Sequence, residues 1–173
     1  MHTVFFVLYI LASIIWGDWK NWKEYYSTFL FFVIGDLLYQ FLLYNHTMWF
    51  FHISFDEEYL KNHTMIALAK MVVQYSTTTV IFLGNYPKSI IKQFLWISLW
   101  VAVFASSEYL SLTFWGGISH HHGWTMGWSI LFDYVMFTLI RIHFSHPLVA
   151  WGLSLIFIIV LWHAFDLNLD LLK

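Results

Sequence analysis

The chain has 173 residues, of which 60% are hydrophobic and 10% charged, whereas an average soluble domain has roughly 25% charged residues. The length fits one bundle without a second folded domain, and the formal net charge of -2 provides no basic surface for nucleic acid. The absence of cysteine excludes disulfides, thiolate metal sites and a thiol nucleophile.

Six apolar runs make up most of the sequence, and each approaches the length of about 20 residues with which a helix crosses a hydrocarbon core of roughly 30 Å. The predicted spans cover residues 1–16, 27–44, 64–83, 90–112, 124–140 and 148–165. The first run lacks the basic start and the cleavage site of a signal peptide, which favours an uncleaved span. We therefore expect an all-α integral membrane protein, a single domain over residues 1–173 built as a bundle of six transmembrane helices.

Short turns separate most of the runs, so consecutive helices are expected to be antiparallel neighbours. The longest connection, residues 45–63, contains the acidic residues 56–58 and several aromatic side chains. We expect this connection to lie at the membrane interface as a short amphipathic segment.

Basic residues gather in alternate loops. One set of loops contains Lys20, Lys23, Lys88, Lys92 and Arg141, and the opposite set contains Lys61 and Lys173. Because cytoplasmic loops are enriched in Lys and Arg, this distribution predicts a multi-pass plasma membrane protein with its basic loops in the cytoplasm. Both termini are then expected outside.

Tryptophans flank the predicted spans, as in the aromatic belts of membrane proteins. Those beside the first basic loop are Trp16, Trp19 and Trp22, and those beside the outer loops are Trp49, Trp115 and Trp124. Their expected role is anchoring at the level of the lipid headgroups.

Four runs each contain one ionisable residue, although a charge at the bilayer centre costs about 2.5–3.5 kcal/mol on insertion scales. Asp36 and Asp133 fall near the middle of their spans, and Lys70 and Glu108 fall in the outer parts of theirs. The matching depths predict a pair of carboxyls, one of them protonated near neutrality, and a salt bridge between Lys70 and Glu108. The first and sixth runs contain no Asp, Glu, Lys or Arg and are expected to be plain hydrocarbon anchors.

Polar residues recur at helical spacing on four of the runs. The stripes are Lys70, Gln74, Thr77 and Thr78; Thr125, Ser129 and Asp133; Asp36 and Gln40; and Glu108 and Ser111. Such stripes either line a hydrated cavity or join neighbouring helices through hydrogen bonds. The candidate polar centre comprises Asp36, Asp133, Lys70, Glu108 and Gln74, and its two deep carboxyls favour a functional role.

Histidines concentrate near the predicted outer face, and neutral imidazole is a common ligand of zinc. The candidate ligands are His120, His121, His122 and His163, with Glu108 nearby. Three consecutive residues do not easily direct all their rings at one metal, so the competing interpretation is a set of amphipathic interface residues. No HExxH motif, nucleophile elbow or phosphate-binding glycine loop is present.

Four short segments form a further pattern: Gly17-Asp18-Trp19-Lys20-Asn21-Trp22-Lys23, Gly35-Asp36-Leu37-Leu38-Tyr39, Asn62-His63-Thr64 and His122-Gly123-Trp124. Together they resemble a functionally uncharacterised family of small polytopic membrane proteins from Bacillus-like and Clostridium-like spore-forming bacteria. The resemblance extends over nearly the whole chain and implies a bacterial plasma membrane. It brings no activity, cofactor or catalytic residue with it.

Three hypotheses for function follow. The first is a non-enzymatic membrane protein, either a small transporter or channel subunit or a sensor, in which Asp36 and Asp133 respond to protons or cations. The alternative is an intramembrane hydrolase that acts on a lipid from the outer face with a histidine-bound zinc. The third is an assembly partner of a larger membrane complex. The expected partners are the lipid bilayer and a second copy or other membrane proteins, and no nucleic acid is expected.

Overall fold

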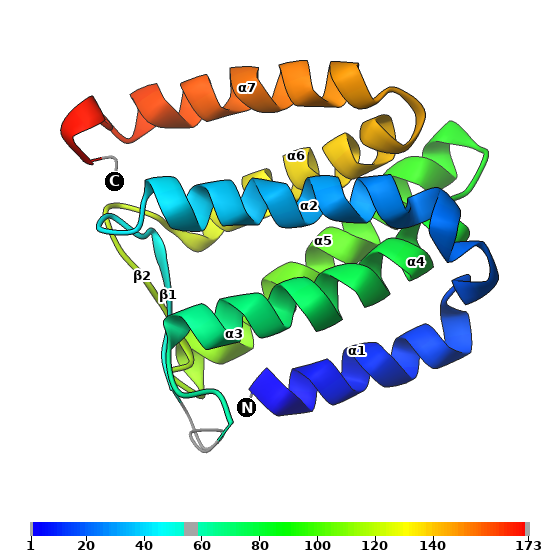
Figure 1. Cartoon of the computed structure of the whole chain (residues 1–173), viewed down its shortest axis with the longest axis horizontal. Coiled ribbons are helices and arrows are strands. Elements are labelled where there is room, and N and C mark those ends of the chain that lie inside the picture. Colours follow the sequence, from blue (N-terminus) through cyan, green and yellow to red (C-terminus); the bar gives the residue numbers. More distant parts are fainter. Residues whose placement is uncertain (1, 54–58, 172–173) are drawn as a thin grey trace.

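This computed structural model describes residues 2–53 and 59–171. In these residues six helices form a bundle in which consecutive helices run in opposite directions (Figure 1). They are α1 (His2–Trp16), α2 (Trp22–Leu42), a third helix in three parts, α5 (Ile90–Thr113), α6 (Met126–Ser145) and α7 (Pro147–Ala164). The third helix consists of α3 (His63–Ala69), a π-helical turn (Lys70–Tyr75) and α4 (Ser76–Gly84). The expected helical bundle is therefore confirmed.

Local signals in the sequence explain where these helices begin and end. The side chain of Asn62 accepts a hydrogen bond of 2.9 Å from the backbone N–H of Met65, which caps the start of α3. Pro147 occupies the first turn of α7, where its missing N–H costs nothing. The side chain of Asn85 donates to the carbonyl of Ile81 at 3.0 Å and closes the end of α4.

Four helical segments are long and apolar enough to cross a membrane: Trp19–Leu42, His63–Gly84, Ile90–Thr113 and Pro147–Ala164. The helix α1 is also apolar but shorter. The helix α6, which carries Asp133 and Arg141, is not among the four. The predicted membrane character is thus supported for four helices by length and composition.

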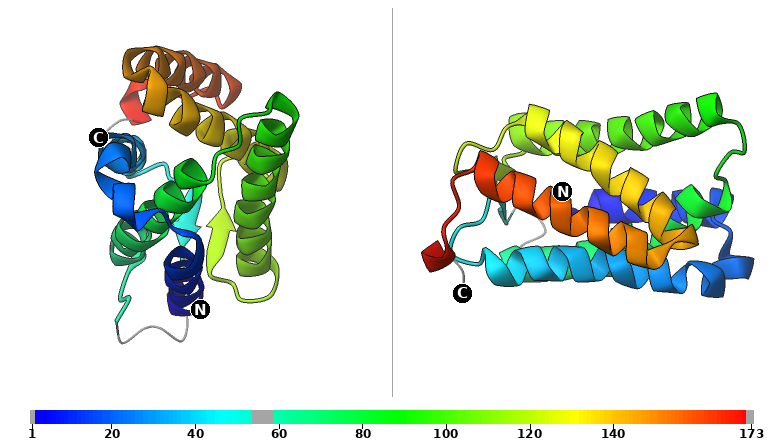
Figure 2. Two further views of the ribbon diagram at one scale, coloured as in Figure 1. Left: turned by 90° about the vertical axis from the view of Figure 1, so that its right-hand side faces the viewer. Right: turned by 90° about the horizontal axis from the view of Figure 1, so that it is seen from above.

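Five of the helices surround a common interior. The third helix packs on α1 and α2, and α6 packs on both α2 and α5. An edge-to-face contact between Tyr9 and Phe104 joins α1 to α5 and completes the ring, and Phe5 makes a similar contact with Trp115 in the segment that follows α5. The remaining helix, α7, lies outside this ring against α6, and its Trp151 contacts Phe31 of α2 (Figure 2).

A short antiparallel ribbon covers one end of the bundle (Figure 1). It is formed by β1 (Trp49–Phe51) and β2 (Ile118–His120), with Trp49 opposite His120 and Phe51 opposite Ile118. Phe51 is buried against Ile66 and Met71 of the third helix. Part of the connection expected at the membrane interface is therefore a strand packed on the bundle, and its acidic residues 56–58 lie outside the described residues.

The distribution of side chains is inverted relative to a soluble protein. Large apolar side chains face outward, with Leu148 87% and Ile90 76% exposed. Buried polar residues include Thr28, Gln74, Thr77, Thr78, Thr79, Ser111, Ser129 and Asp133. A water-soluble monomer rarely exposes such extended apolar surface, whereas a membrane bundle faces lipid with it.

Two expectations about individual elements are wrong. The helix α1 is not a plain anchor, because its Tyr9 and Ser13 are buried and it packs along the third helix. Trp124 is not an interface anchor, since it is only 4% exposed and its indole N–H donates to Ser129. Of the other predicted anchors, Trp16, Trp19, Trp22 and Trp115 are exposed, whereas Trp49 is half-buried and its indole N–H donates to Glu108.

Candidate functional site

The residues of the predicted polar centre lie in the half of the bundle nearest the ribbon. Asp36 is in the last third of α2, and Asp133 is in the first half of α6. Lys70 and Gln74 belong to the π-helical turn, and Glu108 is near the end of α5. Asp36 lies off the middle of its helix because α2 begins at Trp22, several residues before the predicted start.

Glu108 joins the ribbon to the helices. Its carboxylate oxygen Oε1 lies 2.7 Å from Nε2 of His120 on β2 and accepts hydrogen bonds from the indole of Trp49 at 3.2 Å and the hydroxyl of Ser129 at 2.5 Å. Among the described residues its ion-pair partner is His120, and no ion pair joins it to Lys70. Bonds of this kind to a charged acceptor are stronger than those between neutral groups.

Asp36 has a full set of partners. Its two carboxylate oxygens accept hydrogen bonds from the hydroxyl of Tyr75 at 2.7 Å and from the amide of Gln40 at 3.2 Å. The other end of the Gln40 amide lies 2.9 Å from Nε2 of His63, whose Nδ1 accepts the backbone N–H of Phe51 at 3.0 Å. A continuous chain of polar groups therefore runs from β1 to the Asp36 carboxylate.

Lys70 lies within the π-helical turn, with its ammonium 4.4 Å from the centre of the Phe51 ring. This is a cation–π distance. The charges of Asp36, Glu108 and Asp133 all act on Lys70. A π-helical turn changes which side chains of a helix face inward, and such turns are frequent at functional sites.

Asp133 differs from the other members of the centre. It is 7% exposed, and its Oδ2 is buried without a hydrogen-bond partner among the described residues. The charges of Glu108 and Lys70 act on it across the interior. An unpaired buried polar group costs about 1–3 kcal/mol, and more when it is charged, so its presence requires an explanation beyond packing.

The interior also contains polar groups that the predicted centre omitted. The amide of Gln74 donates to the hydroxyl of Tyr9 on α1 at 3.2 Å, and the hydroxyl of Thr78 is buried with no hydrogen-bond partner in the part of the chain that the structure describes. The i+4 spacing already associated Gln40 with Asp36 and Ser129 with Asp133. Tyr9 and Tyr75 gave no such signal, because isolated tyrosines in apolar runs look like core residues.

The candidate metal ligands point in different directions. His120 faces Glu108, the ring of His121 lies 2.7 Å from the hydroxyl of Ser119, and His122 stacks on His46 with ring centres 3.5 Å apart. His163 is exposed on the last turn of α7. Over residues 2–53 and 59–171, no group of three or more His, Asp or Glu side chains could hold a metal ion.

Local backbone geometry accounts for this divergence. His122 has a φ of 54°, an uncommon left-handed value for a residue other than glycine, and the following Gly123 has a φ of 80°. The chain therefore turns sharply after β2, and the three consecutive rings separate. The pKa of His46 is lowered by its burial and further by the charge of the stacked His122.

Comparison of the chain with protein-family models, with curated proteins and with solved structures finds no match.

Proposed function

We propose that this protein is a multi-pass plasma membrane protein whose six helices all cross the bilayer and whose polar centre takes up and releases a proton or a small cation. It then acts as a small transporter or channel subunit, or as a membrane sensor. Four helices of membrane-spanning length and the outward-facing apolar surface support the location. The five basic residues of the alternate loops favour a cytoplasmic position for the end opposite the ribbon.

The observation that carries the proposal is the unpartnered carboxyl of Asp133. Asp36 and Glu108 are held by several hydrogen bonds each, as expected for groups that stabilise the bundle. Burial of the Asp133 carboxyl also costs free energy, but no hydrogen bond from the described residues offsets that cost at Oδ2. A carboxyl in this position, acted on by Lys70 and Glu108, can exchange a proton or coordinate a small cation without first breaking a hydrogen bond at Oδ2.

The alternative of a zinc-dependent lipid hydrolase has less support, because the described histidines and carboxylates do not converge on one point. The hypothesis of an assembly partner is compatible with an apolar groove between α6 and α7, lined by residues such as Leu139, Leu153 and Phe157. Lipid fills such a groove equally well, so the groove does not favour this hypothesis over the first.

The first test compares Asp133→Asn with Asp36→Asn and with the exposed control Glu24→Gln. The carboxyl stretch of Asp133 in the infrared spectrum of lipid-reconstituted protein is expected to titrate with pH and to be absent in Asp133→Asn. Asp133→Asn is expected to unfold at the same temperature as the wild type, since Asn is isosteric with Asp and no hydrogen bond to Oδ2 is lost. Proton or cation flux into liposomes then separates a transporter from a sensor.

Two outcomes would contradict the proposal. One is an Asp133 carboxyl that does not titrate and responds to no cation. The other is failure of Asp133→Asn to insert or fold, which would make Asp133 a structural residue like Asp36.

A further inference from the structure

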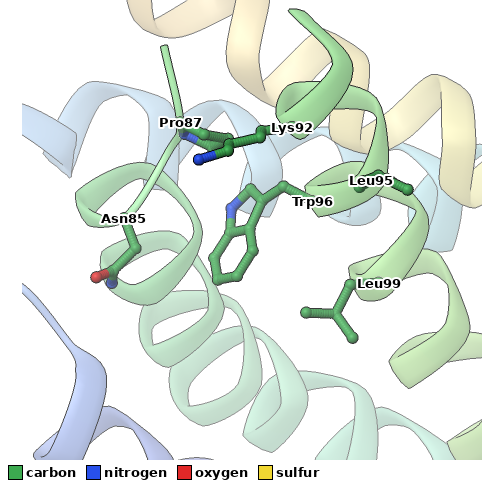
Figure 3. Close-up of a pocket in the computed structure, with 6 residues that line it drawn as sticks. All are labelled: Asn85, Pro87, Lys92, Leu95, Trp96 and Leu99. Carbon is green, nitrogen blue, oxygen red and sulfur yellow. The ribbon is translucent and has the colours of Figure 1, made fainter. Parts of the chain in front are cut away.

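A pocket lies at the end of the bundle opposite the ribbon, between the α4–α5 connection and the first turns of α5 (Figure 3). Its volume is about 290 Å³, and its walls are Asn85, Pro87, Lys92, Leu95, Trp96 and Leu99. The polar centre lies toward the other end, so this pocket is not part of it.

Hydrogen bonds hold the walls in place. The indole N–H of Trp96 donates to the carbonyl of Phe82 at 3.1 Å, which orients its ring. The amide of Gln93 donates to the carbonyl of Pro87 at 3.0 Å, and Asn85 is bonded to backbone carbonyls of α1 and α4. The pocket is therefore formed before any ligand arrives, which lowers the entropic cost of binding.

The pocket changes from charged to apolar along α5. Lys92 is exposed on the first turn of α5, and the apolar side chains of Leu95 and Leu99, 60% and 52% exposed, follow it along the helix. The spacing of i, i+3 and i+7 keeps the three side chains on one face of the helix. One cation is thus followed by an apolar surface that continues toward the middle of the membrane.

We propose that this pocket binds an anionic phospholipid, with its phosphate at Lys92 and one acyl chain along Leu95 and Leu99. The inference rests on the membrane location proposed above. Basic pockets at the ends of membrane helices on the cytoplasmic side recognise anionic headgroups.

The surrounding charges favour an anion. Lys88 belongs to the same connection, and Arg141 lies over the ring of Tyr86 at 4.9 Å. Asp18 also lies at this end, but its carboxylate accepts hydrogen bonds from Tyr25 at 2.6 Å and Asn21 at 2.9 Å. These bonds hold the pKa of Asp18 below its usual value, so Asp18 stays ionised and offsets one of the basic residues at this end, which leaves an excess of positive charge.

The test measures lipid retention by the full chain in detergent, using native mass spectrometry with phosphatidylglycerol or phosphatidylcholine. Phosphatidylglycerol is expected to bind more tightly, and Lys92→Gln is expected to weaken its binding about fivefold, the effect of one Lys near an anionic lipid. Lys92→Arg keeps the charge and the preference. The control Lys23→Gln removes a basic residue at the same end outside the pocket and is expected to change binding less than twofold.

Equal binding of the two lipids would overturn the proposal. Equal weakening of phosphatidylglycerol binding by Lys92→Gln and Lys23→Gln would also overturn it, because that result indicates a diffuse electrostatic effect and not a specific pocket. Soluble glycerophosphoglycerol in large excess is expected not to displace the lipid, and displacement would disprove the acyl-chain contact. If Lys92→Gln does not fold, Leu99→Trp fills the apolar end of the pocket and is expected to weaken phosphatidylglycerol binding, and unchanged binding by this variant would overturn the proposal. Asp133→Asn should keep the lipid preference, so the two proposals fail independently.

Discussion

At the scale of single residues, the carboxyl groups of the interior differ in the number of hydrogen bonds that they accept. Within residues 2–53 and 59–171, Glu108 accepts three hydrogen bonds and Asp36 two, whereas Oδ2 of Asp133 accepts none. A buried carboxylate with partners stabilises the elements that supply them, and one without partners is available for exchange. The three residues therefore have different expected roles although all are acids in apolar runs.

Glu108→Gln is expected to destabilise the protein by about 1–3 kcal/mol, because the bonds from His120, Trp49 and Ser129 lose their charged acceptor. The measurement is unfolding in micelles. Glu24→Gln, an exposed change of the same chemistry, is expected to stay within about 0.5 kcal/mol of the wild type. Equal stability of the two variants would show that Glu108 does not hold the ribbon.

At the scale of elements, the loop after α1 lies very close to the backbone of the third helix at the end of the bundle opposite the ribbon, and this contact fixes the position of the third helix there. The backbone N–H of Asp18 donates to the carbonyl of Val80 at 3.3 Å. A Cβ atom added at Gly84 would lie 2.5 Å from the Cβ of Asp18, closer than two carbon atoms can pack. A glycine is therefore required where the loop after α1 crosses the end of α4.

Gly84→Ala is expected to destabilise the protein by about 1–3 kcal/mol, because the loop or the helix must shift. Gly35→Ala is the matched control, since no atom lies within 4 Å of an added Cβ there. In the interior of α2 that change is expected to be neutral or stabilising by up to about 1 kcal/mol. Thermal unfolding of the two variants measures the difference, and a stable Gly84→Ala protein would contradict the packing at this crossing.

At the scale of the whole molecule, the ends of the bundle carry different chemistry. The ribbon end holds the polar centre and most of the histidines, and the opposite end holds Lys20, Lys23, Lys88, Lys92 and Arg141. The N-terminus and the C-terminal segment lie at the ribbon end (Figure 1). This polarity agrees with six crossings and with a single orientation set by basic loops.

The absence of cysteine allows a direct test of this topology. Single cysteines at the exposed positions Lys61 and Lys88 are expected to react with an impermeant thiol reagent from opposite sides of the membrane, Lys88→Cys from the cytoplasm. A cysteine at His146 is the control and should react from the same side as Lys88→Cys. Labelling of Lys61→Cys and Lys88→Cys from one side would contradict the six crossings.

Local properties of the sequence determined the helical class, the number of helices and the positions of the buried ionisable residues. Apolar length and polar spacing reside within single segments, so they can be read without knowing how the segments meet. The same spacing grouped Asp36 with Gln40 and Ser129 with Asp133, and the first of these pairs is hydrogen bonded.

Which residues become partners depends on how the helices meet in three dimensions. Glu108 meets His120 instead of Lys70, Trp124 is buried, and β1 pairs with β2 across a long stretch of sequence. These contacts depend on the order and rotation of the helices and on the turn at His122, which no single segment specifies. For the same reason the unpartnered state of Asp133, on which the proposed function rests, could not be predicted from the chain alone.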